Sequence, residues 1–143
     1  MSKKLKVGFW LDDGAYMPTK GYDTDAGLDL RTPGDMNVFP NESRVIDTGV
    51  HLLVPEGWCG LIVAKSSLNI DNALNVTGLV DCNFTGTIKV RVYNHNQHNV
   101  YTFDNGDKVA QIMFVEVPKL NLVYNPVTKD GVRGVNGYGS TGR

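Results

Sequence analysis

Hydrophobic and polar positions alternate along much of this chain in short runs. Examples are Lys6–Trp10, Arg44–Asp47 and Thr87–Tyr93. A period of two is typical of β-strands that bury one face. Gly, Pro, Asn and Asp gather between the runs, for instance at residues 33–34 and 105–106, so that turns recur about every 8 to 15 residues. The pattern predicts an all-β, jelly-roll-like fold.

One stretch instead has the spacing of a short helix. It runs from Ser66 to Leu74, where a serine is placed to cap the first turn. Leu68, Ile70 and Leu74 are expected to face the core. The sequence thus predicts one short helix in an otherwise β fold.

The chain has 143 residues, the size of one domain, and we divide it into a β core, residues 1–130, and a C-terminal arm, residues 131–143. The arm is rich in glycine, so it is expected to be flexible and to let backbone N–H groups approach an anion. Arg133 can bind phosphate bidentately, Thr141 adds a hydroxyl donor, and Tyr138 offers a ring for base stacking. This composition predicts an arm that covers a nucleotide; the alternative is a flexible tail without function.

Two common nucleotide motifs are excluded in the arm. Gly137, Gly139 and Gly142 have the G-x-G-x-x-G spacing of a dinucleotide-binding fold, but the sequence leaves no room for the helix that this motif needs. Gly134 and Gly139 have the spacing of a Walker A loop, but Ser140 stands where that loop needs a lysine. Neither a Rossmann site nor a P-loop is therefore expected.

Charge and cysteine content narrow the class of protein. The net charge of −1 gives no basic footprint for polymeric nucleic acid, although a local basic cluster suffices for a small anion. Cys59 and Cys82 form no C-x-x-C pair and are expected to be buried thiols rather than a disulfide. No charged-then-apolar leader opens the sequence, and no apolar run approaches the roughly 20 residues that span a bilayer. We therefore expect a cytoplasmic protein that does not bind membranes.

Three segments carry groups suited to phosphate chemistry. Asp29 lies among apolar residues that alternate as in a strand. Lys65, Ser66 and Ser67 stand where the predicted helix begins, and a helix N-terminus attracts phosphate. Asp81 follows two apolar residues in a predicted β-hairpin, so it is expected to be partly desolvated and suited to act as a general base for water. Each segment alone also fits a solvated turn residue or an ordinary helix cap.

The remaining polar candidates are one amide and the histidines. Gln111 lies in an apolar strand, and a buried amide is expected to have a specific partner. His95 and His98 have the spacing of metal ligands, but with no further ligand nearby a solvated turn is favoured. His51 and the two distant cysteines do not match the ligand set of a zinc deaminase.

The order and spacing of five segments resemble one family closely, the homotrimeric all-β deoxyuridine triphosphatases (dUTPases). The segments are AGLDL (Ala26–Leu30), AKSSL (Ala64–Leu68), GLVDCNFTG (Gly78–Gly86), GDKVAQI (Gly106–Ile112) and RGVNGYGSTG (Arg133–Gly142). They extend over nearly the whole chain. Each segment is weak evidence alone, but five in the same order are specific.

The resemblance implies hydrolysis of dUTP to dUMP and pyrophosphate, which keeps uracil out of DNA and supplies dUMP for thymidylate synthesis. Asp81 is the implied general base for the water that attacks the α-phosphorus. The implied cofactor is Mg²⁺, bound mainly by the triphosphate and water, with Asp29 holding the water shell of the metal. Phe84 is implied to pack on the deoxyribose, where a ribose hydroxyl would collide.

The resemblance further implies a homotrimer with shared active sites. The second and fourth segments come from one chain, the hairpin from a second and the arm from a third. The residues implied to bind base and sugar are Asn75, Gly78, Phe84, Lys89 and Tyr138. The residues implied to bind phosphate are Lys65, Ser66, Ser67, Gln111, Arg133, Gly139, Ser140 and Thr141.

The sequence departs from the pattern of the family at four positions. Lys65 and Lys108 stand where the family usually has arginine, so a bidentate fork becomes a point charge. Phe84 replaces the common tyrosine, and Asn136 replaces a glycine of the arm. Two alternatives remain. One is a dCTP deaminase of the same fold, which would need an additional acid that the hairpin lacks. The other is a nucleotide sensor without turnover, but the retained carboxylates and the complete arm argue against it.

Overall fold

The computed structural model describes residues 4–126, 131–139 and 141–142. Within these ranges the chain forms ten β-strands and one helical turn, η1 (Ser67–Asp71). The strands are β1 (Gly8–Leu11), β2 (Leu28–Arg31), β3 (Met36–Val38), β4 (Ser43–Asp47), β5 (Val50–Leu53), β6 (Trp58–Val63), β7 (Leu74–Val80), β8 (Lys89–Asn94), β9 (Tyr101–Phe103) and β10 (Lys108–Glu116). No helix in the described part has the length and hydropathy needed to cross a membrane.

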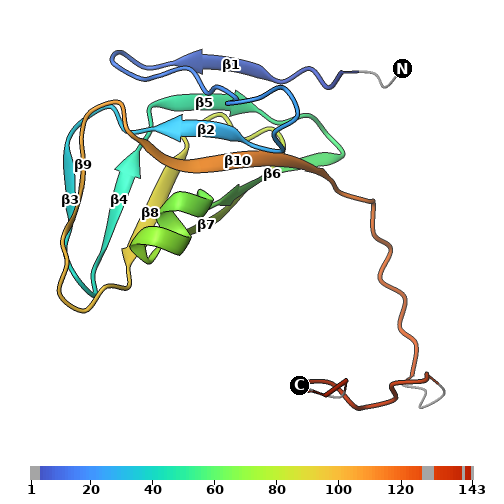
Figure 1. Ribbon diagram of the computed structural model, residues 1–143. Coiled ribbons are helices and arrows are strands. Elements are labelled where there is room, and N and C mark those ends of the chain that lie inside the picture. The colour runs from blue at the N-terminus through green and yellow to red at the C-terminus, as the bar shows by residue number, and fades with distance from the viewer. Residues whose placement is uncertain (1–3, 127–130, 140, 143) are drawn as a thin grey trace.

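The strands form one large and two small antiparallel sheets. The large sheet has six strands in the order β2-β10-β6-β7-β8-β4, while β1 pairs with β5 and β3 pairs with β9. Figure 1 shows the large sheet strongly curled, with the two small sheets beside it. The predicted all-β fold with one short helix is therefore confirmed.

The core is built from the buried positions of alternating strands. In β8 exposed and buried residues alternate without interruption, and Val90 and Val92 are buried. Phe103 of β9 is the largest fully buried side chain. The wider core is aliphatic and includes Leu30, Val38, Ile46, Val50, Leu52, Val54, Ile62, Leu74, Val76, Ile88, Val109 and Ile112. Period-two patterning thus supplies the buried faces as predicted.

Strand β1 departs from this pattern. The run Lys6–Trp10 is indeed a strand in part, but all four residues of β1 are exposed, with Phe9 at 47% and Trp10 at 41%. β1 pairs only with β5, so it belongs to a two-stranded sheet at the edge of the fold. Val7, just before β1, is half-buried and packs against the core, but the expectation of a buried face is wrong for β1 itself.

The predicted helix is shorter than expected. Leu68 faces the core, whereas Ile70 is 77% exposed and Leu74 is buried as the first residue of β7. The inward placement of Ile70 is wrong, since residues two positions apart lie on different sides of a helix. The helical turn ends where β7 must begin to pair.

Both cysteines are free thiols, which agrees with the expectation of no disulfide. Cys59 and Cys82 are each half-buried rather than buried. Cys82 lies in the loop after β7 and packs against the core from one side. Its position outside a strand explains why the sheet does not cover it completely.

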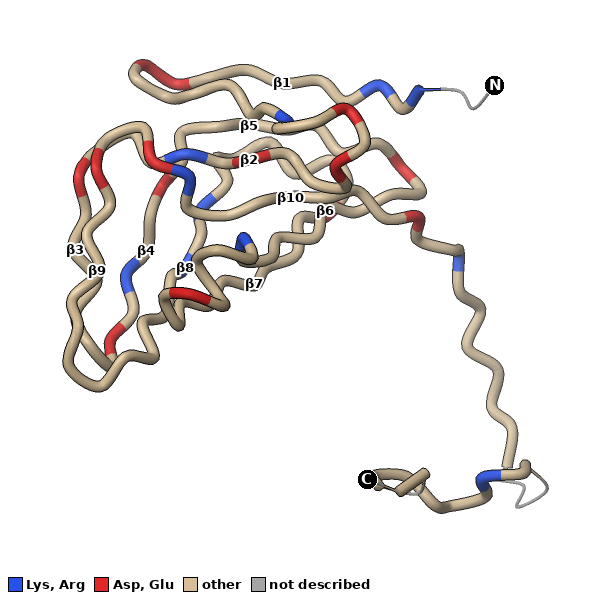
Figure 2. Tube along the Cα trace, in the orientation of Figure 1, with Lys and Arg blue, Asp and Glu red and all other residues tan. Residues whose placement is uncertain are grey.

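The chain leaves the sheets after β10. The backbone N–H of Val117 still donates to the carbonyl of Gly57, at 2.8 Å, but the segment of residues 118–126 that follows is extended and exposed. Figure 1 shows this segment carrying the C-terminal arm away from the sheets. Figure 2 shows basic and acidic positions intermixed over the sheets and few charges along the extended segment. The described residues of the arm are all exposed.

Candidate functional site

The hairpin between β7 and β8 opens because β7 changes partner. β7 pairs with β8 from Leu74 to Val76 and with β6 from Thr77 to Val80, while β8 pairs with β4. The gap between the separated strands is a cleft of about 620 Å³, within the size range of small-molecule sites. We call it the hairpin cleft; it is lined by Ile62, Gly78, Leu79, Val80, Asp81, Phe84, Gly86, Thr87, Ile88 and Lys89. Four residues that were predicted for the site therefore line this cleft: Gly78, Asp81, Phe84 and Lys89.

A tight turn presents Asp81 and Phe84 at this cleft. The N–H of Phe84 donates to the carbonyl of Asp81 at 3.4 Å, and Asn83 has a left-handed φ of 65°. The N–H of Asn83 donates to the carbonyl of Val54 at 3.2 Å, which ties the turn to the core. Asp81 is exposed in the single chain, so the expected partial desolvation is not seen there. The reason is that Val80 turns into the core at 7% exposure and leaves Asp81 facing solvent.

Gly86 is required by the position of the Phe84 ring. A Cβ at residue 86 would lie 2.5 Å from the Cζ of Phe84. Because Phe84 is 46% exposed, its ring has space to turn away from an added methyl group. The absence of a side chain at Gly86 therefore keeps the aromatic face over the cleft.

Gly86→Ala is expected to displace the ring and lower kcat/KM for dUTP, the substrate that the resemblance implies, by about 10- to 100-fold, the cost of a small misplacement in a site. Thermal unfolding should change little, because the ring moves into solvent. Gly34→Ala is the matched control, since no heavy atom lies within 4 Å of a Cβ at Gly34. Steady-state kinetics and calorimetry of both variants check this expectation; equal kcat/KM values would contradict it.

Asp29 lies between two lysines from other strands or loops. Lys65 Nζ donates to Asp29 Oδ1 at 2.6 Å, and Lys108 Nζ lies 3.2 Å from Asp29 Oδ2. Asp29 is only 5% exposed. Burial by itself raises the pKa of Asp29, but the hydrogen bonds and charges of Lys65 and Lys108 together outweigh it, so the pKa lies below the ordinary value. The carboxylate is thus ionised and holds both ammonium groups in place.

A basic pocket of about 370 Å³ surrounds these lysines. It is lined by Arg31, Lys65, Ser67, Leu68, Tyr101, Asp107 and Lys108. Sequence reasoning missed Arg31, whose Nη1 donates to the carbonyl of Gly106 at 2.8 Å. The signal was present, because Arg31 follows Asp29 by two positions and strand residues two apart share a face.

Ser66, Asn75 and Gln111 line a third pocket, of about 530 Å³. Gln111 Nε2 donates to the carbonyl of Ala64 at 3.1 Å, so the amide has the specific partner that was expected, although Gln111 is only half-buried. Asn75 lies here and not in the hairpin cleft, because residues 75–77 of β7 line this pocket while residues 78–80 line the cleft. One chain therefore separates two residues that were both assigned to base recognition.

The predicted arm residues lie apart from all three pockets. Arg133, Tyr138, Gly139 and Thr141 are exposed, and Ser140 lies outside the described residues. The backbone hydrogen bonds within the described arm, such as that from Asn136 to Arg133 at 3.0 Å, close local turns. Within one chain the predicted residues therefore form separate groups, three at pockets and one in the arm.

Comparison with known proteins gives one consistent result. The sequence profile of the dUTPase family matches residues 13–142. The deoxyuridine 5'-triphosphate nucleotidohydrolase of Mycolicibacterium gilvum (strain PYR-GCK) is 36% identical over 150 residues, which cover 99% of this chain and 97% of the relative. The protein of the same name from Clostridium tetani (strain Massachusetts / E88) is 31% identical over 143 residues, which cover 98% of this chain and 96% of the relative.

Solved structures agree on the fold. The dUTPase of Staphylococcus bacteriophage 80alpha, solved with dUPNHPP, superposes with a TM-score of 0.88 at 23% identity and covers 98% of this chain and 100% of its own. The dUTPase of phage phi11 of S. aureus gives a TM-score of 0.80 at 23% identity, covering 89% and 100% of the two chains. With the profile match over residues 13–142, these findings establish that the chain belongs to the dUTPase family and is a dUTP diphosphatase.

Proposed function

We propose that Asp81 is the general base for hydrolysis of dUTP. Its carboxylate accepts a proton from the water whose oxygen bonds to the α-phosphorus, and the bond from that phosphorus to the bridging oxygen of the β-phosphate breaks. The products are dUMP and pyrophosphate. The observation that carries the proposal is the hairpin cleft, where Asp81 stands exposed beside Phe84. A positioned base contributes about 10²- to 10⁴-fold to the rate.

Deoxyuridine occupies the hairpin cleft in this proposal. Gly78 leaves room for the base, Phe84 packs on the sugar, and Lys89 lies at the edge of the cleft. Tyr138 of the arm covers the base. Support for Asn75 is weaker, because it lines the neighbouring pocket with Ser66 and not the hairpin cleft. A base with a different donor pattern leaves buried polar groups unpaired, which provides discrimination without editing.

The triphosphate is bound by the other two pockets and by the arm. The basic pocket and the Ser66 pocket supply ammonium, hydroxyl and amide groups that suit an anion. The proposed phosphate ligands are Lys65, Ser66, Ser67 and Gln111 together with Arg133, Gly139, Ser140 and Thr141. Ser140 belongs to this set by sequence alone, since it lies outside the described residues.

Mg²⁺ is the proposed cofactor. Within the described residues no three His, Cys, Asp or Glu side chains gather as a metal site. The oxygens of Asp29 accept lysine bonds but keep lone pairs for water. This donor set fits an ion held mainly by the triphosphate and its waters, since Mg²⁺ dehydrates reluctantly. The ion when bound neutralises phosphate charge, and Asp29 would hold its waters while the lysines turn toward the phosphates.

The active site is proposed to be shared among the chains of a homotrimer. Support comes from the separation of the predicted residues in one chain. The extended segment adds further support, because Leu120, Leu122 and Tyr124 are 77%, 91% and 91% exposed and need a partner surface. The proposal includes the division of the chain into a core, residues 1–130, and an arm, residues 131–143. The core holds the pockets, and the arm reaches the site of another chain of the trimer.

The cellular role follows from the reaction. Hydrolysis of dUTP keeps uracil out of DNA, and the dUMP released supplies thymidylate synthesis. The two free cysteines favour the cytoplasm, where thiols stay reduced. We propose no polymeric nucleic acid and no membrane as partner. A regulatory protein that binds the outer surface is compatible with this function.

Phe84→Ala is expected to relax selection of dUTP over UTP by about 10-fold or more, because the ring no longer excludes a ribose hydroxyl. Pyrophosphate release with Mg²⁺ from dUTP, UTP, dCTP and dTTP, compared between the wild type and the variant, measures this. Phe39→Ala, which changes an exposed phenylalanine outside the pockets, is the control. If the ratio of kcat/KM for dUTP to that for UTP is unchanged, Phe84 does not recognise the sugar. Release of ammonia from dCTP would favour the alternative of a dCTP deaminase.

A further inference from the structure

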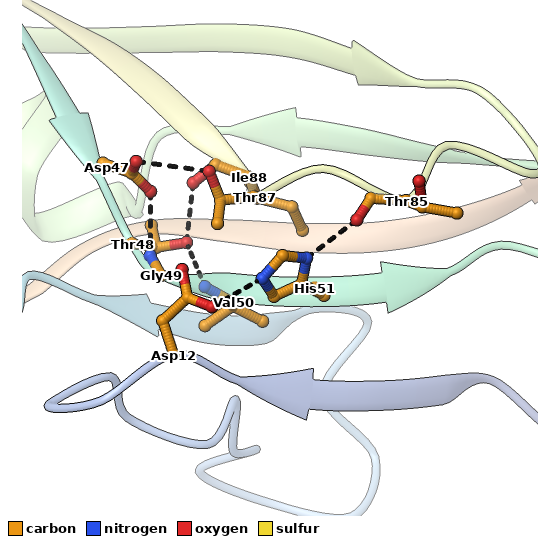
Figure 3. A network of polar contacts seen from close by, with 9 residues as sticks. All are labelled: Asp12, Asp47, Thr48, Gly49, Val50, His51, Thr85, Thr87 and Ile88. Carbon is orange, nitrogen blue, oxygen red and sulfur yellow. Dashed lines mark hydrogen bonds and ion pairs between the residues drawn. The ribbon is translucent and has the colours of Figure 1, made fainter.

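His51, on β5, lies between Asp12, in the N-terminal loop that follows β1, and Thr85, in the loop before β8 (Figure 3). Its Nε2 is 2.8 Å from Asp12 Oδ1, and its Nδ1 is 2.8 Å from the backbone oxygen of Thr85. Thr85 stands between Phe84 and Gly86, which both line the cleft. The imidazole is 13% exposed, so water reaches little of it. His51 therefore ties the N-terminal loop to one wall of the cleft.

The partners of the ring determine its charge. A carboxylate and a carbonyl oxygen only accept hydrogen bonds, so both ring nitrogens must carry a proton to satisfy them. The Trp10 ring stacks on the imidazole with 4.5 Å between centroids and 10° between planes, which also favours a cation. The hydrogen bonds that the ring donates to Thr85 and Asp12 raise the pKa of His51, and the negative charges of Asp12 and Asp47 raise it further, while desolvation lowers it. His51 thus stays protonated to a higher pH than an ordinary histidine.

Loss of the proton removes one of the two bonds. Charge-assisted hydrogen bonds are about twice as strong as neutral ones, so the remaining N–H stays on Nε2 toward Asp12. The Nδ1 lone pair then faces the oxygen of Thr85, and the contact becomes repulsive. Further along the wall, Thr48 Oγ1 donates to the carbonyl of Ile88 at 2.7 Å, and Ile88 N–H donates to the carbonyl of Val50 at 2.8 Å. Deprotonation therefore frees the wall at Thr85, whereas the hydrogen bonds of Ile88 keep its other end in place.

We propose that His51 is a positioning residue for nucleotide binding: when protonated it holds the Thr85 carbonyl, and with it the cleft wall formed by residues 86–89. The inference rests on the proposed placement of deoxyuridine in the hairpin cleft. By linkage, a ligand that binds the protonated form more tightly than the neutral form raises the pKa of His51 by the logarithm of the ratio of the two affinities. The gain in affinity is complete below the pKa and is lost as the pH rises through it.

The first test follows His51 in the wild-type protein. Its imidazole resonances are titrated by NMR with and without saturating dUMP, and the exposed His98 serves as an internal control. We expect dUMP to raise the pKa of His51 and to leave the imidazole resonances of His98 in place. The dissociation constant of dUMP should rise about fivefold or more as the pH passes through the pKa of His51. An unchanged pKa of His51 at saturation would overturn the inference.

Two variants give an independent test by kinetics. His51→Gln removes the titrating group, so the alkaline rise in KM for dUTP should disappear while kcat stays within about twofold. Asp12→Asn keeps an acceptor but loses the charge, so the rise in KM should move to lower pH. His98→Gln is the matched control and should keep the wild-type profile. A wild-type profile in Asp12→Asn would contradict the inference, and this variant decides the matter even if His51→Gln does not fold.

Backbone resonances of residues 78–89 separate this inference from the proposed site. If dUMP shifts these resonances but not the titration of His51, the cleft remains the nucleoside site and the role of His51 is wrong. If dUMP shifts neither, the placement of deoxyuridine is wrong and the role of His51 falls with it.

Discussion

Asp81→Asn is expected to lower kcat for dUTP by about 10²- to 10⁴-fold, the contribution of a general base. Asparagine has nearly the same shape as aspartate but does not take a proton from water. The loss should appear in kcat, with affinity for dUMP nearly intact, because the base acts on the attacking water and not on the nucleoside. Pyrophosphate release and dUMP binding by calorimetry measure the two quantities.

The control for this variant is Asp23→Asn, which changes an exposed carboxylate in a loop away from the pockets. It should keep the wild-type rate. Thermal unfolding should be nearly the same for both variants, since Asp81 is exposed in the single chain. Turnover by Asp81→Asn near the wild-type rate would assign the base to another residue.

A chain that ends at Pro126 is expected to lose about 10²-fold or more in turnover, because donors that stabilise the phosphates are removed. Its midpoint of thermal unfolding should be almost unchanged, since the described arm residues are exposed. The turnover of full-length Arg133→Ala should lie between that of the wild type and that of the truncated chain. Kinetics and calorimetry of the three proteins check this order.

Loss of folding in the truncated chain would contradict the separation of core and arm. Wild-type turnover without the arm would instead support the alternative of a tail without function.

Local patterning predicted the strands well where a layer covers them. The alternation of β8 follows from its sequence, because each outward residue is polar or aromatic and Val90 and Val92 turn inward. It failed at β1, where Phe9, Trp10 and Leu11 are consecutive apolar residues and all remain exposed in the single chain. It failed again at Ile70, because Leu68 faces the core and a residue two positions further lies on the other side of the helical turn. Burial depends on tertiary neighbours that a local pattern does not contain.

The residues assigned to the site stay a prediction from the five segments, and those segments do not predict how one chain arranges them. Asn75 and Gly78 are close in sequence but line different pockets. The role of His51 was missed because its partners are far away in sequence: Thr85 is 34 residues away and Asp12 is 39. A lone histidine in a strand gives no sign of such contacts. Arg31 was within reach, since it shares a strand face with Asp29.

The central claim is that each active site combines the hairpin of one chain with the arm of another, with Asp81 as the base. Mixing two inactive variants tests it most directly: Asp81→Asn with an intact arm, and the chain that ends at Pro126 with an intact Asp81. After joint unfolding and refolding, random trimers should regain about one quarter of the sites, because half of the hairpins and half of the arms are intact. Mixed trimers, verified by mass spectrometry, that remain as inactive as the separate variants would contradict the shared site.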